Sequence, residues 1–512
     1  MADKGTGWSA LWNTEDWVAV WIGFFIIIVI LAGLTVKIPG FKWVTDGEFA
    51  SFVGRMTPAV EQLAKEADKK GEADLRAKAE ALRVAMGKGD RKGIAETAKS
   101  FEEAAKKVND AELKKKAAQV GKEIKDNASN TLGKVFSSTN IAGSLYIAIG
   151  VLILSMIGMM LLGGKVGKFL VGFPVVFIIA WISQFIAGNF TVNYYGIEYV
   201  LWCLALGLFI SNVIGVPDWL SEAVRTEFYI KTGLVILGSG ILFKEILEAG
   251  FLGIIQAVLV VSVIWYACYW IALKLKVDEE FAVILSSAVS ICGVSAAIAT
   301  CGAIKGDPKK LSYTTSIVLI CAVPMLVLQP LFAKWVGMPD VVAGAWLGGT
   351  LDTSGSVVAA GALISEAAMK VGVIVKMSQN VLIGVAAFIL AVVWTLKTVD
   401  HVPGADKPGA IEIWNRFPKF VLGFIVASLV FSFLLDPKTV SAVKGSLGGI
   451  RTMWFALAFT SIGLETKFSE LSKLGGGRPA LAFLIAQALN IIWTLVLAYI
   501  FFGGWIFEAP KF

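Results

Sequence analysis

The stretch LGGTLDTSGSVVAAGA, from Leu347 to Ala362, decides the fold because it cannot form an ordinary lipid-facing helix. It lies inside a long apolar run, yet it is crowded with glycines and hydroxyl side chains. Such residues are tolerated at membrane depth where the backbone lines a cavity, since the freed N–H and C=O groups then meet water or a ligand. A second stretch, SSAVSICGVSAAIATCGA from Ser286 to Ala303, has the same character. We therefore predict two discontinuous helices within a membrane bundle.

The composition outside these stretches predicts an all-α polytopic membrane protein. Of the 512 residues 56% are hydrophobic and only 17% are charged, and the mean hydropathy is +0.73. A bilayer core needs about 20 apolar helical residues, and alternating barrel-like strands are absent. About thirteen spans of that kind are expected, near residues 18–36, 141–162, 169–187, 197–215, 227–243, 248–273, 280–304, 312–333, 341–364, 371–396, 417–435, 450–466 and 479–502.

One segment departs from this pattern. Residues Gly47 to Lys134 are rich in Ala, Glu and Lys, and Gly and Pro residues are expected to divide them into two or three helices. The predicted organisation is an N-terminal span in 1–46, a soluble α-helical insert in 47–135 and a membrane bundle in 136–512. The insert is interpreted as a solvated hairpin, with a docking module as the alternative. The acidic pair before the first apolar run argues against a cleavable signal.

Several classes of function are disfavoured. The net charge of +7 is spread along the loops, so nucleic-acid binding is not expected. The five cysteines lie in apolar runs without metal-ligand spacing, and the single histidine, His401, falls in a loop rich in Pro and Gly. We predict no metal site, no cofactor and no enzyme activity, because no nucleophile–base pair is evident.

An internal repeat is expected. The stretch GSGILFKEILEAG from Gly238 aligns without gaps on GLETKFSELSKLG from Gly463, which pairs Phe243 with Phe468, Glu245 with Glu470 and Gly250 with Gly475. These stretches belong to the fifth and twelfth predicted spans, and an odd offset gives the copies opposite orientations. The pattern predicts an inverted repeat, as in secondary transporters.

The first broken helix supplies candidate substrate-binding residues: Ser290, Cys292, Gly293 and Ser295. An unwound turn there would direct N–H groups and hydroxyls into the bundle, where the positive end of a half-helix attracts an anion. The alternative is close packing, because small residues also let membrane helices approach one another.

The second broken helix holds Asp352 in the middle of a span, where a carboxylate is expensive and is functional by default. The oxygen-bearing residues Thr350, Thr353, Ser354 and Ser356 surround it in sequence. Such groups suit a proton network or a hard cation, so we predict an ion-coupling site for H+ or Na+. Asp352 would repel an anion unless a proton or cation neutralises it. This repulsion would couple anion binding to the binding of the proton or cation.

Lys376, Gln379 and Asn380 form one polar face on an apolar helix and are further substrate-binding candidates. Lys376 would balance the charge of Asp352 or of an anionic substrate, or it snorkels to the interface. Lys231 has the same two interpretations. Gln184, Asn189 and Asn212 are secondary candidates, more consistent with helix–helix hydrogen bonds.

In combination, several motifs from Lys231 onward resemble those of the bacterial sulfate exporter family. They are KTGLVILG from Lys231, SICGVSAAIA from Ser290, GGTLDTSGSVVAAG from Gly348, VIVKMSQN from Val373, RFPKFVLGFIVAS from Arg416 and FTSIGLETKFSEL from Phe459. The resemblance implies an inner-membrane transporter of small anions with inverted repeats, in which Lys376, Cys292, Gly293 and Gly361 match family motifs.

The chain departs from the family where many members carry a histidine followed by an acid, since Asp352 and Thr353 stand there. Ser356 replaces a glutamine, and Gln379 replaces a basic residue. The site has lost positive charge, which points to another anion, a zwitterion or another coupling ion. The insert also lies outside the family pattern.

The leading hypothesis is a secondary active transporter of a small anion, sulfate or another sulfur-containing or organic anion, coupled to H+ or Na+ in a bacterial inner membrane. In it, a core holding the broken helices moves against a scaffold. A homodimer is left open. The alternatives are a Na+/H+ exchanger without an anion substrate, and a membrane sensor or enzyme that uses the insert as its output domain.

Overall fold

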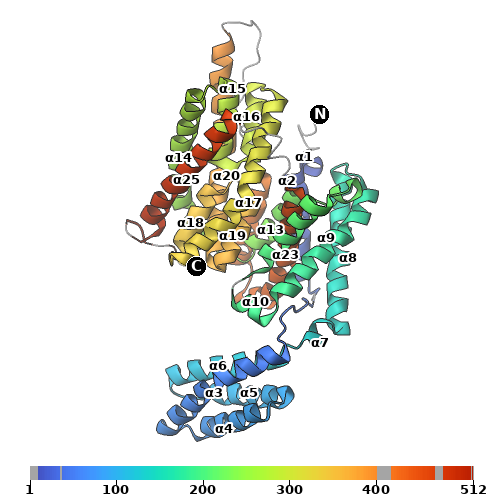
Figure 1. Ribbon diagram of the computed structural model, residues 1–512, viewed down its shortest axis with the longest axis vertical. Coiled ribbons are helices and arrows are strands. Elements are labelled where there is room, and N and C mark those ends of the chain that lie inside the picture. The colour runs from blue at the N-terminus through green and yellow to red at the C-terminus, as the bar shows by residue number, and fades with distance from the viewer. Residues whose placement is uncertain are drawn as a thin grey trace. The chain divides into compact units, whose positions relative to one another are not determined.

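The computed structural model describes residues 10–34, 37–195, 197–399, 417–467, 477–504, 506–508 and 510, and in these residues the fold is helical without strands (Figure 1). Seven described helices are long and apolar enough to cross a membrane. They are α8 (Ser138–Leu161), α9 (Val166–Ala187), α14 (Phe243–Lys274), α17 (Pro308–Trp335), α20 (Glu366–Val399), α23 (Pro437–Glu465) and α25 (Arg478–Phe502). The expected all-helical class is confirmed, whereas the count of about thirteen spans stays a prediction.

Shorter elements occupy the other predicted spans. The apolar stretch near the N-terminus forms α2 (Glu15–Leu31), preceded by α1 (Ala10–Asn13). Two of these shorter helices end in a π-helical turn, as α15 (Glu279–Ser287) also does: α11 (Tyr199–Phe209) continues into η1 (Ile210–Ile214), and α22 (Lys419–Leu429) continues into η3 (Val430–Leu434). A further predicted span holds α13 (Thr226–Gly238), whereas α10 (Phe190–Tyr194) and α12 (Asp218–Ser221) lie between predicted spans.

Both small-residue stretches are interrupted helices. The first consists of α15 (Glu279–Ser287), the π-turn η2 (Ala288–Cys292) and α16 (Val294–Ile304), with Gly293 between η2 and α16. The second consists of α18 (Asp340–Thr350) and α19 (Ser354–Ile364), separated by Leu351, Asp352 and Thr353. The predicted discontinuity is confirmed at both places.

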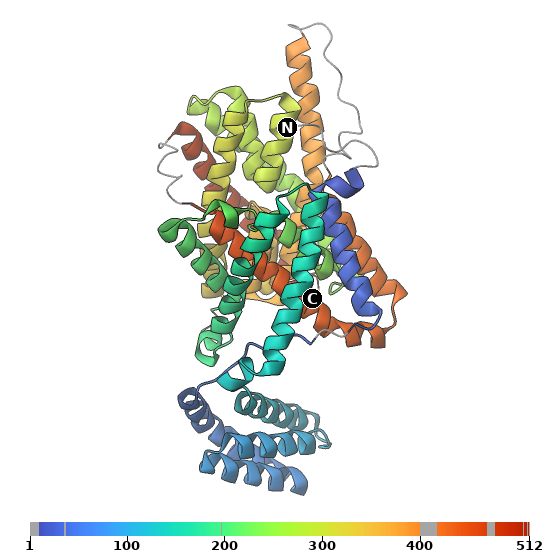
Figure 2. The same ribbon diagram turned by 90° about the vertical axis from the view of Figure 1, so that its right-hand side faces the viewer.

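The chain divides into two compact units, one of which comprises residues 1–36, 148–181 and 200–512. Within this unit the helices pack in two groups, with few contacts between the groups. In the first group α13 packs against α2, α22 and α23. In the second group α20 packs against α14, α16, α18 and α19, and α25 lies alongside α14 and α18 (Figures 1 and 2).

Two helix pairs in this unit make matching contacts. A β-carbon at Gly463 in α23 would lie 2.8 Å from the carbonyl oxygen of Leu204 in α11, and one at Gly238 in α13 would overlap the carbonyl oxygen of Phe424 in α22. Each pair is also joined by a hydrogen bond. Ser211, in the π-turn η1 after α11, donates one of 2.8 Å to the carbonyl of Thr466, which follows α23. Ser428 in α22 likewise donates one of 2.6 Å to the carbonyl of Ile241, which follows α13.

The aligned residues Gly238 and Gly463 thus each lie at a close contact between two helices, and the inverted repeat stays a prediction. The other members of the second copy, Phe468, Glu470 and Gly475, lie outside the described residues.

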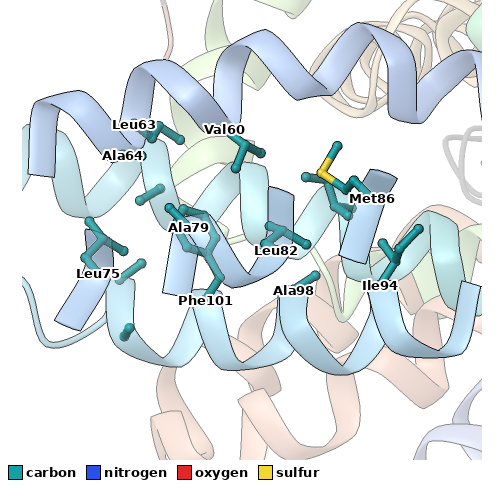
Figure 3. Packing of buried hydrophobic residues seen from close by; sticks show 14 of the residues in the cluster. Val60, Leu63, Ala64, Leu75, Ala79, Leu82, Met86, Ile94, Ala98 and Phe101 are labelled. Carbon is teal, nitrogen blue, oxygen red and sulfur yellow. The ribbon is translucent and has the colours of Figure 1, made fainter. Parts of the chain in front are cut away.

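The other unit comprises residues 37–147 and 182–199. Its core is made by α3 (Asp46–Lys69), α4 (Ala73–Lys88), α5 (Arg91–Ala105) and α6 (Ala111–Ser129), with α7 (Leu132–Val135) following. Apolar side chains at helical spacing, among them Leu63, Leu82 and Phe101, pack into one cluster between these helices (Figure 3). The boundaries predicted for the insert, 47–135, stay a prediction.

The expectation of two or three helices in the insert was wrong, because the structure has four long ones. Pro58 lies inside α3 without ending it. The chain does turn at the glycines Gly71 and Gly89, as expected, but it also turns before Asp110, whose carboxylate accepts the N–H of Leu113 and caps α6. The Asp110 cap was overlooked because it lies within a stretch of uniformly charged composition.

Candidate functional site

The first helix break lies at Gly293, where the backbone conformation and the neighbouring atoms allow only glycine. Gly293 has φ +50° and ψ −110°, a backbone conformation closed to residues with a side chain. A β-carbon there would lie 2.6 Å from Cγ1 of Val318 and 3.0 Å from Cβ of Asp352. The first break therefore packs directly against the second, which brings Gly293 and Asp352 together from residues distant in sequence.

The second break is stabilised by its own hydroxyl groups. Thr353 has extended backbone angles and its Oγ1 accepts the Ser356 N–H at 3.1 Å, which caps α19. The Thr353 and Ser356 hydroxyls lie 2.8 Å apart. Asp352, immediately before this cap, is 2% exposed, and its Oδ2 has no hydrogen-bond partner among the described residues. A buried carboxylate oxygen without a partner is costly, so it marks a place where a proton, a cation or water would be stabilised.

Three polar residues of α20 hold the breaks in place. Lys376 donates to the carbonyl oxygen of Ile291 at 2.6 Å and to Oε1 of Gln379 at 2.9 Å. Gln379 donates to the carbonyl of Ser290 at 2.8 Å, and Asn380 donates to Oγ of Ser354 at 3.2 Å. The Lys376 ammonium thus sits at the C-terminal end of the half-helix that stops at η2, where a positive charge is favourable.

A cavity of about 800 Å³ opens beside the two breaks. Five of the predicted site residues line it: Cys292, Ser295, Thr353, Ser354 and Asn380. The other predicted site residues do not line it, namely Ser290, Gly293, Thr350, Asp352, Ser356, Lys376 and Gln379. The structure thus separates residues that face the cavity from residues that support or adjoin the break.

The opposite wall is charged, and Lys231 belongs to it. Its ammonium lies 2.9 Å from Glu15 and 2.9 Å from Asp16, both at the start of α2, and 3.6 Å from Glu227 in its own helix. Asp16 and Glu227 line the cavity with Lys231. Sequence reasoning missed these three acids. The available signals were an acidic pair directly before an apolar run and the i, i+4 spacing of Glu227 and Lys231.

Behind the second break lies a set of buried amides that sequence reasoning also missed. Gln487 of α25 donates to the carbonyl of Thr350 at 2.9 Å, and the Thr350 hydroxyl donates to Oε1 of Gln329 at 3.1 Å. Gln256 of α14 donates to the carbonyl of Ala345 at 2.9 Å. Each amide is isolated in an apolar span, and this isolation was the signal.

Two of the secondary candidates, Asn212 and Asn189, make hydrogen bonds that hold the backbone in place. Asn212 donates to the carbonyls of Leu208 and Thr466, both at 2.9 Å. Asn189 caps α10 by accepting the N–H groups of Thr191 and Val192. His401 lies outside the described residues.

Comparison with known proteins places the chain among membrane proteins. The family model described as "Conserved hypothetical protein 698" matches residues 171–482. A UPF0324 membrane protein of Rhodopirellula baltica is 43% identical over 349 residues, which are 66% of this chain and 64% of the relative. Another from Nitratidesulfovibrio vulgaris is 41% identical over 358 residues, covering 68% of this chain and 62% of the relative. The match thus spans less than two thirds of either relative.

A more distant relative is the UPF0324 inner membrane protein YeiH of Salmonella typhimurium, 28% identical over 306 residues, which cover 58% of this chain and 84% of the relative. No solved structure matches the chain. The family model covers more than half of the chain, and seven apolar helices of spanning length accompany the match. The chain therefore belongs to the conserved membrane family described as Conserved hypothetical protein 698, and it is a multi-pass membrane protein.

Proposed function

We propose that this protein is a secondary active transporter that moves a small anion across a bacterial inner membrane by alternating access, coupled to H+ or Na+, and that it is not an enzyme. The observation that carries the proposal is the cavity beside two broken helices, next to a buried carboxylate with an unpartnered oxygen. A sulfur-containing or organic anion is the proposed cargo, and sulfate is the one that the family resemblance implies.

The helix breaks supply the anion-binding chemistry. The N-termini of α16 and α19 both reach the cavity, α16 through Ser295 and α19 through Thr353 and Ser354. The first N–H groups of a helix have no intrahelical acceptor, and the macrodipole makes this end positive. Two such ends and their hydroxyls can bind an oxyanion without a fixed positive side chain.

The two helix groups provide the moving parts. The group around α20 carries both breaks, whereas the group around α13 carries the charged wall. Because the groups share few contacts, the first can shift against the second and expose the cavity to either side in turn. The matching approaches of Gly463 to α11 and of Gly238 to α22 support an inverted repeat, which would relate the two exposed states by an approximate two-fold axis in the membrane plane.

Asp352 provides coupling in this scheme. Its charge opposes an anion in the neighbouring cavity, so a bound proton or sodium ion favours anion binding, and the anion in turn favours ion binding. The effect requires the carboxylate, because an amide carries no charge to neutralise.

The test is Asp352→Asn in proteoliposomes, with anion accumulation driven by a proton or sodium gradient. We expect gradient-driven flux to fall at least about a hundredfold, since one unbalanced buried charge amounts to several kcal/mol. The matched control is Asp340→Asn, an exposed acid in the first turn of α18, which should retain flux. Full coupled transport by the Asp352 variant would contradict the mechanism.

A second candidate is Na+/H+ exchange without an anion, which the unpartnered Oδ2 of Asp352 favours, since that atom can bind either ion. A sodium gradient alone would then drive proton flux in vesicles free of other permeant anions. Dependence of the flux on an added anion would exclude exchange.

A further inference from the structure

The two walls of the cavity differ in charge. On one wall, α16 begins after Gly293 and has no side-chain cap, and Val294 and Ser295 from its first turn line the cavity. Thr353 and Ser354 at the start of α19 line the same wall. The uncapped N–H groups of α16 and the hydroxyls at the start of α19 lie at positive helix ends and suit an oxyanion.

The facing wall carries more acid than base among the described residues. Glu15, Asp16 and Glu227 surround Lys231, and the Lys419 backbone N–H donates to Asp16 at 2.8 Å. If the Lys419 ammonium is counted with that of Lys231, three carboxylates still leave one negative charge unbalanced.

Glu227 carries most of that imbalance. At 3.6 Å it is the most distant of the three acids from the Lys231 ammonium, and its side chain is 48% exposed, whereas those of Glu15 and Asp16 are less exposed. Glu227 also lines the cavity, so its carboxylate is available to a ligand.

Aromatic rings accompany these acids. Phe417 and Phe420 line the cavity, and the Phe420 ring centroid lies 6.0 Å from the Lys231 ammonium. A second cation at this wall would find both a carboxylate and an aromatic face, the combination that binds ammonium groups elsewhere.

Asn380 is an independent sign of a ligand. It is 2% exposed, it lines the cavity, and its Nδ2 donates to Ser354. Its Oδ1 has no hydrogen-bond partner among the described residues. A buried amide atom lacking a partner is costly, so it marks a place where a polar group of a ligand would be stabilised.

From these walls we infer that the cargo is a small zwitterion, with its oxyanion at the starts of α16 and α19 and its ammonium group at Glu227 and the phenylalanine rings. The inference rests on the proposed transport function and refines its cargo, which keeps the oxyanion group but also carries an ammonium group. Among the described residues, no further cation at the cavity would compensate a bare divalent anion such as sulfate for the unbalanced acid, whereas an attached ammonium group neutralises that acid. The cavity volume of about 800 Å³ is ample for such a molecule.

Matched ligands test this on the full-length protein in lipid nanodiscs by calorimetry. Taurine and isethionate differ only in an ammonium and a hydroxyl group, as do β-alanine and 3-hydroxypropionate. In at least one pair we expect the zwitterion to bind at least tenfold more tightly than its hydroxyl analogue and than ethylamine. Equal or tighter binding of the hydroxyl analogues, of sulfate or of ethylamine would overturn the inference, as would a lack of binding by both zwitterions.

A charge-neutral variant locates the ammonium group. Glu227→Gln should weaken zwitterion binding at least tenfold and leave hydroxyl-analogue binding within about threefold. Glu248→Gln is the matched control, because Glu248 is a half-exposed acid on α14 that pairs with Lys244 away from the cavity. Equal loss for both ligand types would contradict the assignment of Glu227. If the Glu227 variant does not fold, the comparison of matched ligands on the wild-type protein still tests the inference.

Flux measurements in proteoliposomes separate this inference from the transport proposal. Gradient-driven accumulation of isethionate or sulfate in preference to the zwitterions would refute the cargo class and leave transport intact. Tight zwitterion binding without gradient-driven accumulation of any solute would refute transport and leave the ligand class intact.

Discussion

Gly293 shows how one missing β-carbon determines the site. Its backbone angles are accessible only to glycine, and the breaks meet at the place where a side chain would otherwise lie. The same contact packs Asp352 against Gly293, so the backbone conformation of Gly293 determines where the buried carboxylate lies.

We expect Gly293→Ala to destabilise the protein by about 2–5 kcal/mol, the combined cost of a strained backbone and an overpacked contact. The measurement is the thermal melting of the detergent-solubilised protein, followed by tryptophan fluorescence. Gly448→Ala is the control, because Gly448 lies within α23 with no atom close to where its β-carbon would stand. A melting temperature for the Gly293 variant equal to that of the control would show that the break accepts a side chain.

At the scale of the element, α3 begins with a capping box. The Thr45 hydroxyl accepts the Glu48 N–H at 3.2 Å, and the Glu48 carboxylate accepts the Thr45 N–H at 2.8 Å. Glu48 also accepts hydrogen bonds from Asn189 and Thr191 in the same unit. Burial alone would raise the pKa of Glu48, but these hydrogen bonds outweigh it and lower the pKa to about 2.

The lowered pKa predicts an acid-sensitive helix. A carboxyl whose pKa falls on folding stabilises the folded state above its unfolded pKa, about 4.3, and loses that contribution as the pH falls towards 2. Glu48→Gln should cost about 1–2 kcal/mol at pH 7, and the gap from wild type should shrink between pH 4.5 and pH 3.

Hydrogen exchange of the α3 amides at these pH values measures the effect of Glu48. Glu103→Gln, an exposed substitution in α5, is the control. A difference from wild type that does not change with pH would mean that the charge of Glu48 contributes nothing.

At the scale of the whole molecule, the two ends of the four-helix segment α3–α6 lie next to each other. The Val44 N–H donates to the Asn130 carbonyl at 2.8 Å, so the two ends of the segment already touch. A short linker can therefore replace the segment without stretching the flanking chain.

Replacing Thr45–Ser129 by Gly-Ser-Gly should leave gradient-driven flux within about threefold of the full chain, because the cavity is lined only by other residues. Proteoliposome flux normalised to inserted protein is the measurement. Adding Asp352→Asn to the shortened chain should abolish what remains. Loss of flux from a correctly inserted shortened chain would favour the sensor interpretation, in which the segment is the output domain.

The sequence alone determined the features that depend on local composition. Apolar runs require membrane helices because lipid offers no hydrogen bonds, and glycines and hydroxyls clustered within such runs require breaks. The same reasoning singled out Asp352, since any acid at that depth is expensive. The helix count of the insert was wrong because α5 ends at Ala105 and α6 begins after the Asp110 cap with no Gly or Pro between them.

Only the tertiary structure decided which groups meet. Lys231 pairs with Glu15 across 216 positions, and Lys376 reaches the Ile291 carbonyl across 85. Periodicity tells which face of a helix is polar but not which helix that face meets, because packing of the whole bundle sets the neighbour. The acid wall of the cavity and the supporting role of Lys376 are therefore properties of the fold, whereas the breaks themselves are properties of the local sequence.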